Sequence, residues 1–328
     1  MKNKNLRFFI FMFLGILTFY WVFKTFSGED SLNYINDNLE MMALLFIAHI
    51  PTLFMDSLSW RILMSNNKLN LKWCIIITWI AQTASKIMPT GVLTGEFVRI
   101  YLGKKRGIPV PQISATVIGD LILATCSLMI MGIISIIIFI NYYKEPGQDI
   151  LDLKFMFLAS SLIILGSVFF CISMRYRLIK SLLRMIISKK VILPFKHFTF
   201  NLLKTDYVLY QLSFQLNRLF LGMSIRLMGW FCGALEIYFF FLIINIDISI
   251  IDVVLIETFT ALMRSIVFFI PAGVGIQELS FILIGNFLGL ANPVSFSMAL
   301  GRRIREIMIG LPAIIAWILL FEKKIKFR

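Results

Sequence analysis

The amino-acid sequence predicts an all-α polytopic membrane protein with about six full spans and two oppositely oriented re-entrant hairpins that form an inverted repeat. Three observations predict this class. Hydrophobic residues make up 59% of the 328 residues and charged residues only 15%. Several apolar runs have the length of about 20 residues that crosses the hydrocarbon core of a bilayer. The pattern P-x-G-V-x-x-x-E occurs twice, at Pro89–Glu96 and Pro271–Glu278. We expect residues 1–328 to form a single integral membrane domain.

Six apolar runs are long enough to be spans, and they are Leu6–Phe26, Met41–Met64, Ile113–Ile140, Phe155–Met174, Leu219–Ile244 and Ser297–Phe321. The first run is too long for the apolar region of a signal peptide and is followed by no small-residue cleavage site, so we expect it to remain as a span. Basic residues accumulate in cytoplasmic loops. The Lys and Arg residues near both ends therefore predict a multi-pass plasma-membrane protein with cytoplasmic N- and C-termini.

The segment after the second span predicts a re-entrant hairpin. Its apolar part, Trp73–Ala81, is too short to cross the bilayer, and basic residues flank it at Lys72 and at Lys104–Arg106. Pro89 interrupts the helix because proline lacks an N–H donor and clashes with the preceding turn. We therefore expect this segment to enter from the cytoplasm, break at the octapeptide, and return to the same side.

The segment before the last span predicts a second hairpin, which enters from outside. Its second arm, Ile276–Leu290, would be about 22 Å long as a helix, and the turn Gly289–Pro293 has no basic residue. The octapeptides lie 182 positions apart, and Ile100 and Gly119 recur as Ile282 and Gly301 at the same offset. One motif on hairpins of opposite direction is typical of an inverted-topology repeat, here over approximately residues 71–141 and 250–321. Chance recurrence of a Pro-x-Gly pattern is the alternative.

A basic stretch between the fourth and fifth spans predicts a cytoplasmic connector over residues 175–218. Within Arg175–Ser188, basic and serine side chains fall on one helical face and Leu and Ile side chains on the other. This pattern is typical of an amphipathic helix that lies on anionic lipid.

Broken helices and charges inside apolar segments define the candidate site. Non-helical backbone is tolerated at membrane depth only where it is buried in protein or lines a wet cavity. A restarting helix offers free N–H groups that attract anions such as a lipid phosphate. Ionisable groups in a membrane usually face the bundle interior and mark a site. The candidate substrate-binding residues are therefore Pro89, Gly91, Gly95, Glu96, Arg99, Asp120, Glu236, Glu257, Arg264, Pro271, Gly273, Gly275, Glu278, Arg302, Arg303, Arg305 and Glu306. Helix capping by Glu96 and Glu278, and ion pairing by the other charges, are the structural alternatives.

The sequence has no pattern of a soluble catalytic site. It contains no P-loop, G-x-S-x-G, H-E-x-x-H or dinucleotide fingerprint. His49 and His197 have no neighbouring metal-ligand pattern. The net charge of +14 comes from basic residues beside apolar runs, so we attribute it to lipid headgroups rather than nucleic acid. We expect no enzymatic activity, no cofactor and no metal. Membrane lipids are the expected partners, and a separate lipid-modifying enzyme is a further candidate.

Four segments carry a family resemblance: MPTGVLTGEFVRIYLGKKRGIP, SATVIGDLILATCSL, FFIPAGVGIQELSFILIGNFLGL and ALGRRIREIMIGLPAIIAWILL. They resemble the flippase-like membrane domain of the lysylphosphatidylglycerol synthase transmembrane family, the membrane half of multiple peptide resistance factors, in a stand-alone form. The family usually has a glycine where this chain has Thr90 and Ala272. Since the chain stops at Arg328, we expect no soluble aminoacyltransferase domain.

The resemblance implies a flippase or transporter that moves a lipid between membrane leaflets. The lipid would be anionic or modified: a phospholipid, an aminoacylated lipid or a polyprenyl-linked lipid. Two other functions stay open. One is a membrane-embedded transferase that acts on a lipid headgroup, and the other is a non-transporting partner of a lipid-modifying enzyme.

Overall fold

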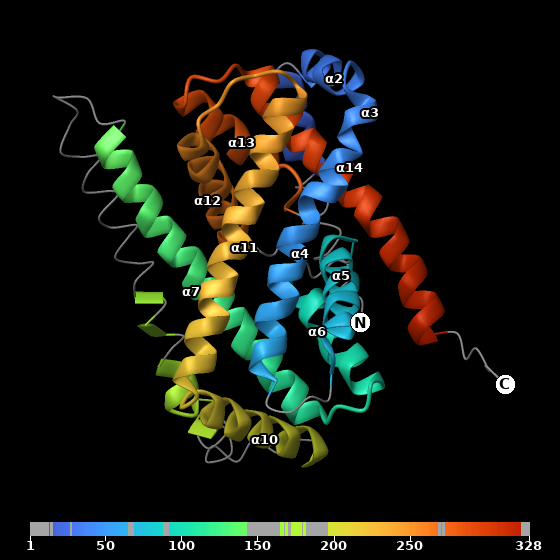
Figure 1. Cartoon of the computed structure of the whole chain (residues 1–328), viewed down its shortest axis with the longest axis vertical. Helices are drawn as coiled ribbons and strands as arrows, with labels where there is room; N and C mark the ends of the chain where they lie inside the picture. The colour runs from blue at the N-terminus through green and yellow to red at the C-terminus, as the bar shows by residue number, and fades with distance from the viewer. Residues whose placement is uncertain are drawn as a thin grey trace. The chain divides into compact units, whose positions relative to one another are not determined.

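The computed structural model of the chain describes residues 16–26, 28–64, 69–87, 92–142, 196–267 and 273–322, together with residues 13 and 270 and short pieces between 165 and 181. These residues are helical with short connections (Figure 1), which confirms the all-α prediction. The helices are α2 (Gly28–Asn36), α3 (Leu39–Met42), α4 (Leu44–Leu63), α5 (Leu71–Ile87), α6 (Val92–Lys105), α7 (Val110–Tyr142), α10 (Lys196–Leu212), α11 (Leu216–Ile243), α12 (Ile250–Ile266), α13 (Ile276–Phe287) and α14 (Asn292–Trp317), which continues into the π-helical turn η2 (Ile318–Glu322).

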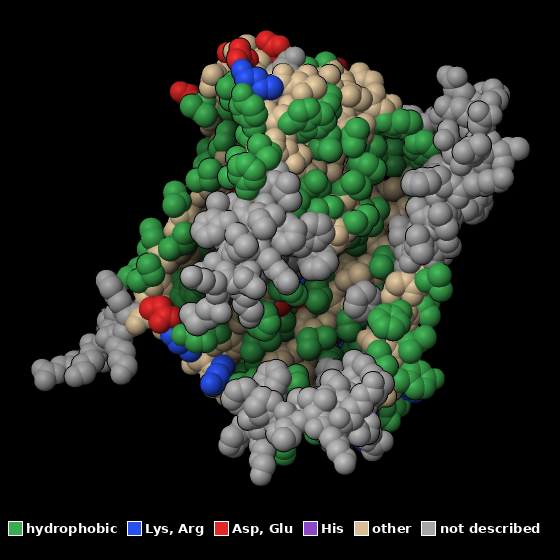
Figure 2. All heavy atoms as spheres, turned by 180° about the vertical axis from the view of Figure 1, so that it is seen from behind, with side chains coloured by type: hydrophobic (Ala, Val, Ile, Leu, Met, Phe, Trp, Pro, Cys, Tyr) green, Lys and Arg blue, Asp and Glu red, His purple; other side chains and the backbone are tan. Residues whose placement is uncertain are grey.

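Long apolar helices confirm four of the predicted spans. In the part of the chain that the structure describes, four stretches are long and apolar enough to cross a membrane: Leu39–Leu63, Val110–Asn141, Leu216–Ile243 and Asn292–Glu322. The structure describes the predicted span Leu6–Phe26 at residues 13 and 16–26, whereas the predicted span Phe155–Met174 lies largely outside the described residues. Figure 2 shows hydrophobic side chains over much of the visible face, as contact with lipid requires.

The last span begins earlier than predicted. Its helix, α14, starts at Asn292 rather than Ser297, because Pro293 suits the first turn of a helix, where an N–H donor is not needed. Arg302 and its charged neighbours up to Glu306 therefore lie in the middle of α14 rather than near the start of the span, where the predicted bounds Ser297–Phe321 put them. Likewise, Gly119 lies inside α7, which starts at Val110.

The second octapeptide interrupts the helical backbone, as predicted: α12 ends at Ile266 and α13 begins at Ile276. Helices α5 and α6 lie on either side of Pro89, and residues 88–91 between them lie outside the described residues. These four helices have 17, 14, 17 and 12 residues, so each is shorter than a full span. Gly273 and Gly275 have φ angles of +59° and +81°, in the left-handed region that glycine adopts without strain. Pro89, Gly91 and Pro271 lie outside the described residues.

Helix boundaries recur at the same offset of 182 residues as the motifs. Helices α6 and α13 end at Lys105 and Phe287, and helices α7 and α14 begin at Val110 and Asn292. The two segments therefore share one order of elements: helix, break, helix, tight turn and long helix. The matching boundaries agree with the predicted repeat, which stays a prediction. The opposite orientation of the two segments stays a prediction.

The tight turns also match at this offset. Gly107 and Gly289 have φ angles of +86° and +79°. The N–H groups that follow them donate to the carbonyl oxygens of Gly103 and Gly285, at 3.2 and 2.8 Å. Both acceptor residues are glycines because the next helix passes very close. A Cβ at Gly103 would lie 2.6 Å from Ile113, and a Cβ at Gly285 would lie 2.0 Å from Ser295.

The chain divides into two compact units, which we describe separately. Unit 1 comprises Met1–Phe54, Ile76–Val98 and Met228–Arg328, and unit 2 comprises Met55–Ile75 and Arg99–Leu227. In unit 1, the acidic segment that follows the first predicted span forms the short helices α2 and α3, and α2 packs against α14.

In unit 2, α10 forms the second part of the predicted connector and packs against α7 (Figure 1). Arg177 Nε donates to Asp206 Oδ2 at 2.9 Å and so joins the start of the connector to α10. The predicted amphipathic helix Arg175–Ser188 lies largely outside the described residues.

Candidate functional site

Most of the candidate charges of unit 1 gather in one polar cluster. It contains residues from five helices: Lys86 (α5), Glu236 (α11), Glu257 and Arg264 (α12), Glu278 (α13), and Arg302, Arg303, Arg305 and Glu306 (α14). We call this set the unit 1 cluster. Its four α14 residues lie within little more than one helical turn, so their side chains reach several neighbouring helices.

Two buried arginines of α14 pair with carboxylates on α11 and α12. Arg305 Nη1 donates to Glu236 Oε2 at 2.9 Å, and Arg302 Nη2 donates to Glu257 Oε2. Arg302 Nε also lies 3.8 Å from Glu236 Oε1. Gly233 on α11 leaves room for Glu257, since a Cβ there would lie 3.2 Å from Glu257 Oε1. All four charged side chains are buried, so each depends on its partner for stability.

Glu278 combines the two roles that the sequence left open. Its Oε2 accepts from the N–H of Gly275 at 2.7 Å, which caps α13, and its Oε1 accepts from Arg303 Nε at 2.8 Å. Arg303 also donates to Glu306 at 3.0 Å, and Lys86 Nζ lies 3.0 Å from the other oxygen of that carboxylate. The Glu278 carboxylate therefore caps α13 with one oxygen and forms an ion pair with the other.

Helix α5 brings Lys86 to the cluster because α5 packs against α14. Trp79 Nε1 donates to the carbonyl of Ile309 at 3.0 Å. Gly310 lets α5 approach, since a Cβ there would lie 3.2 Å from Thr83. Lys86 was not among the sequence candidates. It meets the same criterion as they do, because it is an ionisable residue at the end of an apolar helix, three residues before Pro89.

His49 of α4 also joins this cluster and was missed. Its Nδ1 lies 2.9 Å from Glu236 Oε2 and also contacts Arg305 Nη1. A ring nitrogen either donates or accepts a hydrogen bond, so the tautomer of His49 decides which of the two contacts is a hydrogen bond. The signal was available, because His49 is an ionisable residue inside the predicted span Met41–Met64.

Arg264 is the cation of the cluster that has no carboxylate partner in the described residues. Its spacing of seven residues from Glu257 puts both side chains on one helical face, but Glu257 pairs with Arg302. Arg264 Nη1 lies 3.4 Å from Gln277 Oε1, and among the described residues its Nε has no hydrogen-bond partner. Gly273 packs against the Arg264 side chain. The cluster thus contains five cations and four carboxylates, with the unmatched cation beside the helix break.

Unit 2 contains a second buried network, built from equal numbers of acids and arginines. Asp120 Oδ2 accepts from Arg99 Nη1 at 2.7 Å, and Asp120 Oδ1 accepts from Ser59 Oγ at 3.1 Å. Arg226 donates to both Asp120 and Asp56. The network joins α4, α6, α7 and α11 within unit 2. Because its charges balance, we interpret it as a structural network.

Two members of this network, Asp56 and Arg226, were not among the sequence candidates. Both lie inside predicted spans, so the rule that selected Asp120 would have found them. Arg99 also lies over the ring of Trp60, with 5.2 Å from its guanidinium carbon to the ring centroid. The structure therefore places Arg99 and Asp120 together in a network of unit 2.

The first interruption contributes Gly95 and Glu96 at the start of α6. Gly95 permits a close approach of α6 to α5, because a Cβ there would lie 2.8 Å from the carbonyl oxygen of Ala81. Glu96 is partly buried. Neither residue belongs to the unit 1 cluster as defined above.

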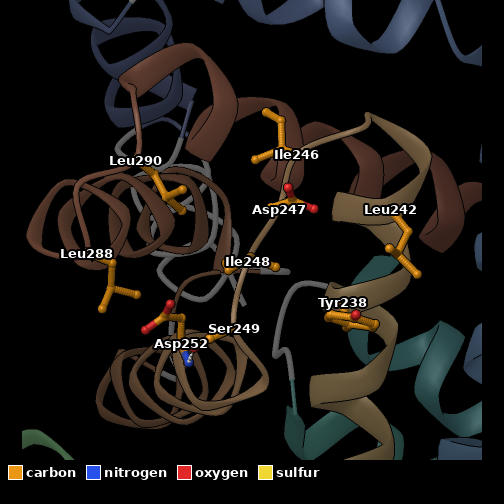
Figure 3. A pocket seen from close by; sticks show the side chains of 9 residues that line it. All are labelled: Tyr238, Leu242, Ile246, Asp247, Ile248, Ser249, Asp252, Leu288 and Leu290. Atoms are coloured by element: carbon orange, nitrogen blue, oxygen red, sulfur yellow. Dashed lines mark hydrogen bonds between the residues drawn. The ribbon is translucent and has the colours of Figure 1, made fainter. Parts of the chain in front are cut away.

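A separate cavity of about 290 Å³ lies in unit 1 between the end of α11, the start of α12 and the turn after α13. Figure 3 shows the carboxylates of Asp247 and Asp252 among its lining residues. Burial raises the pKa of Asp252, and a backbone hydrogen bond from Ser249 opposes this shift. The cavity contains none of the cluster residues, so we do not assign it to the candidate site. Among the described residues, no group of three or more His, Cys, Asp or Glu is arranged to hold a metal ion.

One family model matches nearly the whole chain. The model is described as the lysylphosphatidylglycerol synthase TM region, and it matches residues 6–313. No curated protein and no solved structure matches the chain significantly.

Proposed function

Because the chain belongs to the lysylphosphatidylglycerol synthase TM region family, we propose that it moves an anionic or modified lipid between the two leaflets of the membrane. Its family and its long apolar helices make it a membrane protein related to lipid modification or transport. The proposed substrate is a phospholipid, an aminoacylated lipid or a polyprenyl-linked lipid. The proposed location is the plasma membrane, with both termini in the cytoplasm.

The observation that carries this proposal is the unit 1 cluster, with five cations and four carboxylates beside a broken helix. A lipid headgroup that crosses the bilayer must pass about 30 Å of hydrocarbon, which penalises charge. Fixed guanidinium groups can replace the water around an anionic headgroup, and irregular backbone at a helix break adds polar groups. The excess of positive charge in the cluster matches an anionic substrate.

Transport by this cluster requires only the headgroup to enter the protein. The acyl or prenyl tails stay in the bilayer while the headgroup travels past the cluster. Rocking of one repeat against the other would expose the headgroup to each side in turn, as in transporters built from inverted repeats. Helices α12 to α14 form the second repeat and carry most of the cluster, so motion of this repeat would move the binding groups together.

The cluster favours transport over group transfer. A membrane-embedded transferase needs a carboxylate, thiol or imidazole that is free to act as a base or nucleophile. Each of the four carboxylates of the cluster is instead paired with a cation, at distances of 2.8–3.0 Å for Glu278, Glu236 and Glu306. This pairing suits groups that position charge rather than groups that accept a proton from a substrate.

Leaflet exchange in liposomes tests the proposal. Purified protein would be reconstituted with a trace of fluorescent lipid, and a membrane-impermeant quencher would report the fraction in the outer leaflet over time. The lipids would be an anionic phospholipid, an aminoacylated phospholipid and a polyprenyl phosphate, each with and without a pH gradient. We expect faster exchange of at least one of them than in protein-free liposomes. Absence of exchange for all three would favour a non-transporting partner of a lipid-modifying enzyme.

A further inference from the structure

Two hydrogen-bond donors beside the break between α12 and α13 have no acceptor in the part of the chain that the structure describes. They are Arg264 Nε and Gln277 Nε2, and both are shielded from solvent. Gln277 is 0% exposed, so its amide cannot turn to bulk water. Unpaired buried donors are rare in folded proteins because leaving them unpaired is costly. Two of them side by side indicate a missing acceptor.

The charge of the unit 1 cluster indicates what kind of acceptor is missing. Lys86, Arg302, Arg303 and Arg305 each contact a carboxylate, whereas among the described residues Arg264 forms no salt bridge and has the neutral Gln277 as its polar contact. In a buried network, a cation without a counterion has the largest free-energy cost of desolvation. A ligand that offsets the cost of burying Arg264 must be an anion.

The conformation of the break makes Arg264 available to such a ligand. Its side chain is only partly buried, and its neighbour Ser265 is exposed. The positive φ of Gly273 folds the backbone against the aliphatic stem of Arg264, where a Cβ would lie 3.5 Å from Cγ. The start of α13 is already occupied, since the Glu278 carboxylate accepts from Gly275. The donors Arg264 Nε on α12 and Gln277 Nε2 on α13 therefore lie on opposite sides of the break.

We propose that Arg264 and Gln277 form a phosphate-binding subsite that holds the phosphate group of a lipid headgroup. The planar guanidinium presents Nε–H and Nη–H in a fork that matches two oxygens of one phosphate group. The Gln277 amide supplies a third donor to the same anion and requires no further charge. That the anion is part of a lipid rests on the proposed transport function. The binding of an anion by Arg264 and Gln277 does not depend on that function.

Thermal unfolding of the purified protein in neutral detergent micelles tests the subsite. The probes are short-chain phosphatidate, short-chain phosphatidylcholine and inorganic phosphate. We expect phosphatidate to raise the Tm of the wild type in a concentration-dependent manner, and phosphatidylcholine, whose phosphate is masked by choline, to raise it less. Arg264→Gln should weaken the phosphatidate affinity about tenfold or more, since it removes a charged partner. Gln277→Leu should weaken it less, and Arg264→Lys should keep part of it.

The unliganded variants separate a binding role from a structural one. Without lipid, Arg264→Gln should leave the Tm unchanged or raise it, because it removes a cation that has no counterion. Arg302→Gln should lower the Tm, because it leaves Glu257 unpaired. The exposed cation Lys204, changed to Gln, is the matched control and should alter neither the Tm nor the phosphatidate shift.

Three outcomes would overturn the assignment. A loss of Tm in Arg264→Gln as large as that in Arg302→Gln, with an unchanged phosphatidate shift, would make Arg264 a structural residue. A shift as large with inorganic phosphate as with phosphatidate would assign the subsite to free phosphate instead of a lipid. Leaflet exchange at the wild-type rate in Arg264→Gln, together with unchanged binding, would refute the subsite and leave the transport function standing. Conversely, phosphatidate binding that depends on Arg264 without any leaflet exchange would support the subsite and refute transport.

Discussion

Replacing Asp120 by Asn tests whether the unit 2 network holds its helices together. Asp120 is 0% exposed and accepts hydrogen bonds from Arg99, Arg226 and Ser59. The substitution keeps the volume of the side chain and one acceptor oxygen but removes the negative charge. Two guanidinium groups would then share Asp56 as their remaining carboxylate in the network.

The expected cost follows from this imbalance. Removing one partner of a buried ion pair leaves an uncompensated charge, which typically destabilises a protein by about 3–5 kcal/mol. Arg226→Gln should cost a similar amount for the opposite reason. In the double variant Asp120→Asn/Arg226→Gln, Arg99 and Asp56 stay as one cation and one anion, so we expect a cost well below the sum of the single costs.

Unfolding in mixed micelles with increasing SDS, followed by tryptophan fluorescence and circular dichroism, measures these costs. Asp37→Asn makes the same chemical change at an exposed position and should stay within about 0.5 kcal/mol of the wild type. A cost below about 1 kcal/mol for Asp120→Asn, or additive costs in the double variant, would refute the interpretation of a closed structural network.

Three further predictions concern the repeat and the helix break. Gly285→Ala should destabilise the protein by about 1–3 kcal/mol through its clash with Ser295, and Ser295→Gly should relieve this cost in SDS unfolding; an unchanged stability would contradict the close packing. Glu278→Gln should cost about 1–3 kcal/mol, since it keeps the cap at Gly275 but loses the charge that faces Arg303, and it should slow leaflet exchange; full stability and exchange would exclude both roles. Single cysteines at the exposed positions Lys105 and Ala291, in a variant without the four native cysteines, should react with an impermeant maleimide from the cytoplasmic and external sides respectively; labelling from one side would refute the inverted repeat.

The spans and breaks illustrate what was accessible from sequence. The octapeptides marked both interruptions, because proline and glycine act on the backbone within a few residues of their position. The predicted start of the last span was too late because the first turn of α14 is polar. Hydropathy detects the apolar part of a helix and not a polar first turn. The acidic segment after the first predicted span forms the short helices α2 and α3, which its low hydropathy does not indicate.

The sequence predicted most of the charged residues of the unit 1 cluster, but not which of them form ion pairs with one another. Glu257 and Arg264 share a helical face, yet Glu257 pairs with Arg302, which lies 45 residues away in the sequence. His49 and Gln277 join the cluster from helices whose local sequence gives no hint of the contact. The same limit applies to Asp56, whose partner Arg226 is 170 residues away.

The sequence by itself determined the membrane class, the all-α fold, four long apolar spans and the break between α12 and α13. These features depend on local backbone preferences and on hydrophobic length, which are written in consecutive residues. Only the tertiary structure decided which charges neutralise one another and which cation stays unmatched. Ion pairs form between side chains that packing brings together from distant helices, and the energy of each buried charge depends on that neighbourhood. Arg264 therefore looked like any other arginine in the sequence, and it became the candidate phosphate ligand only when every carboxylate of its cluster was seen to have another partner.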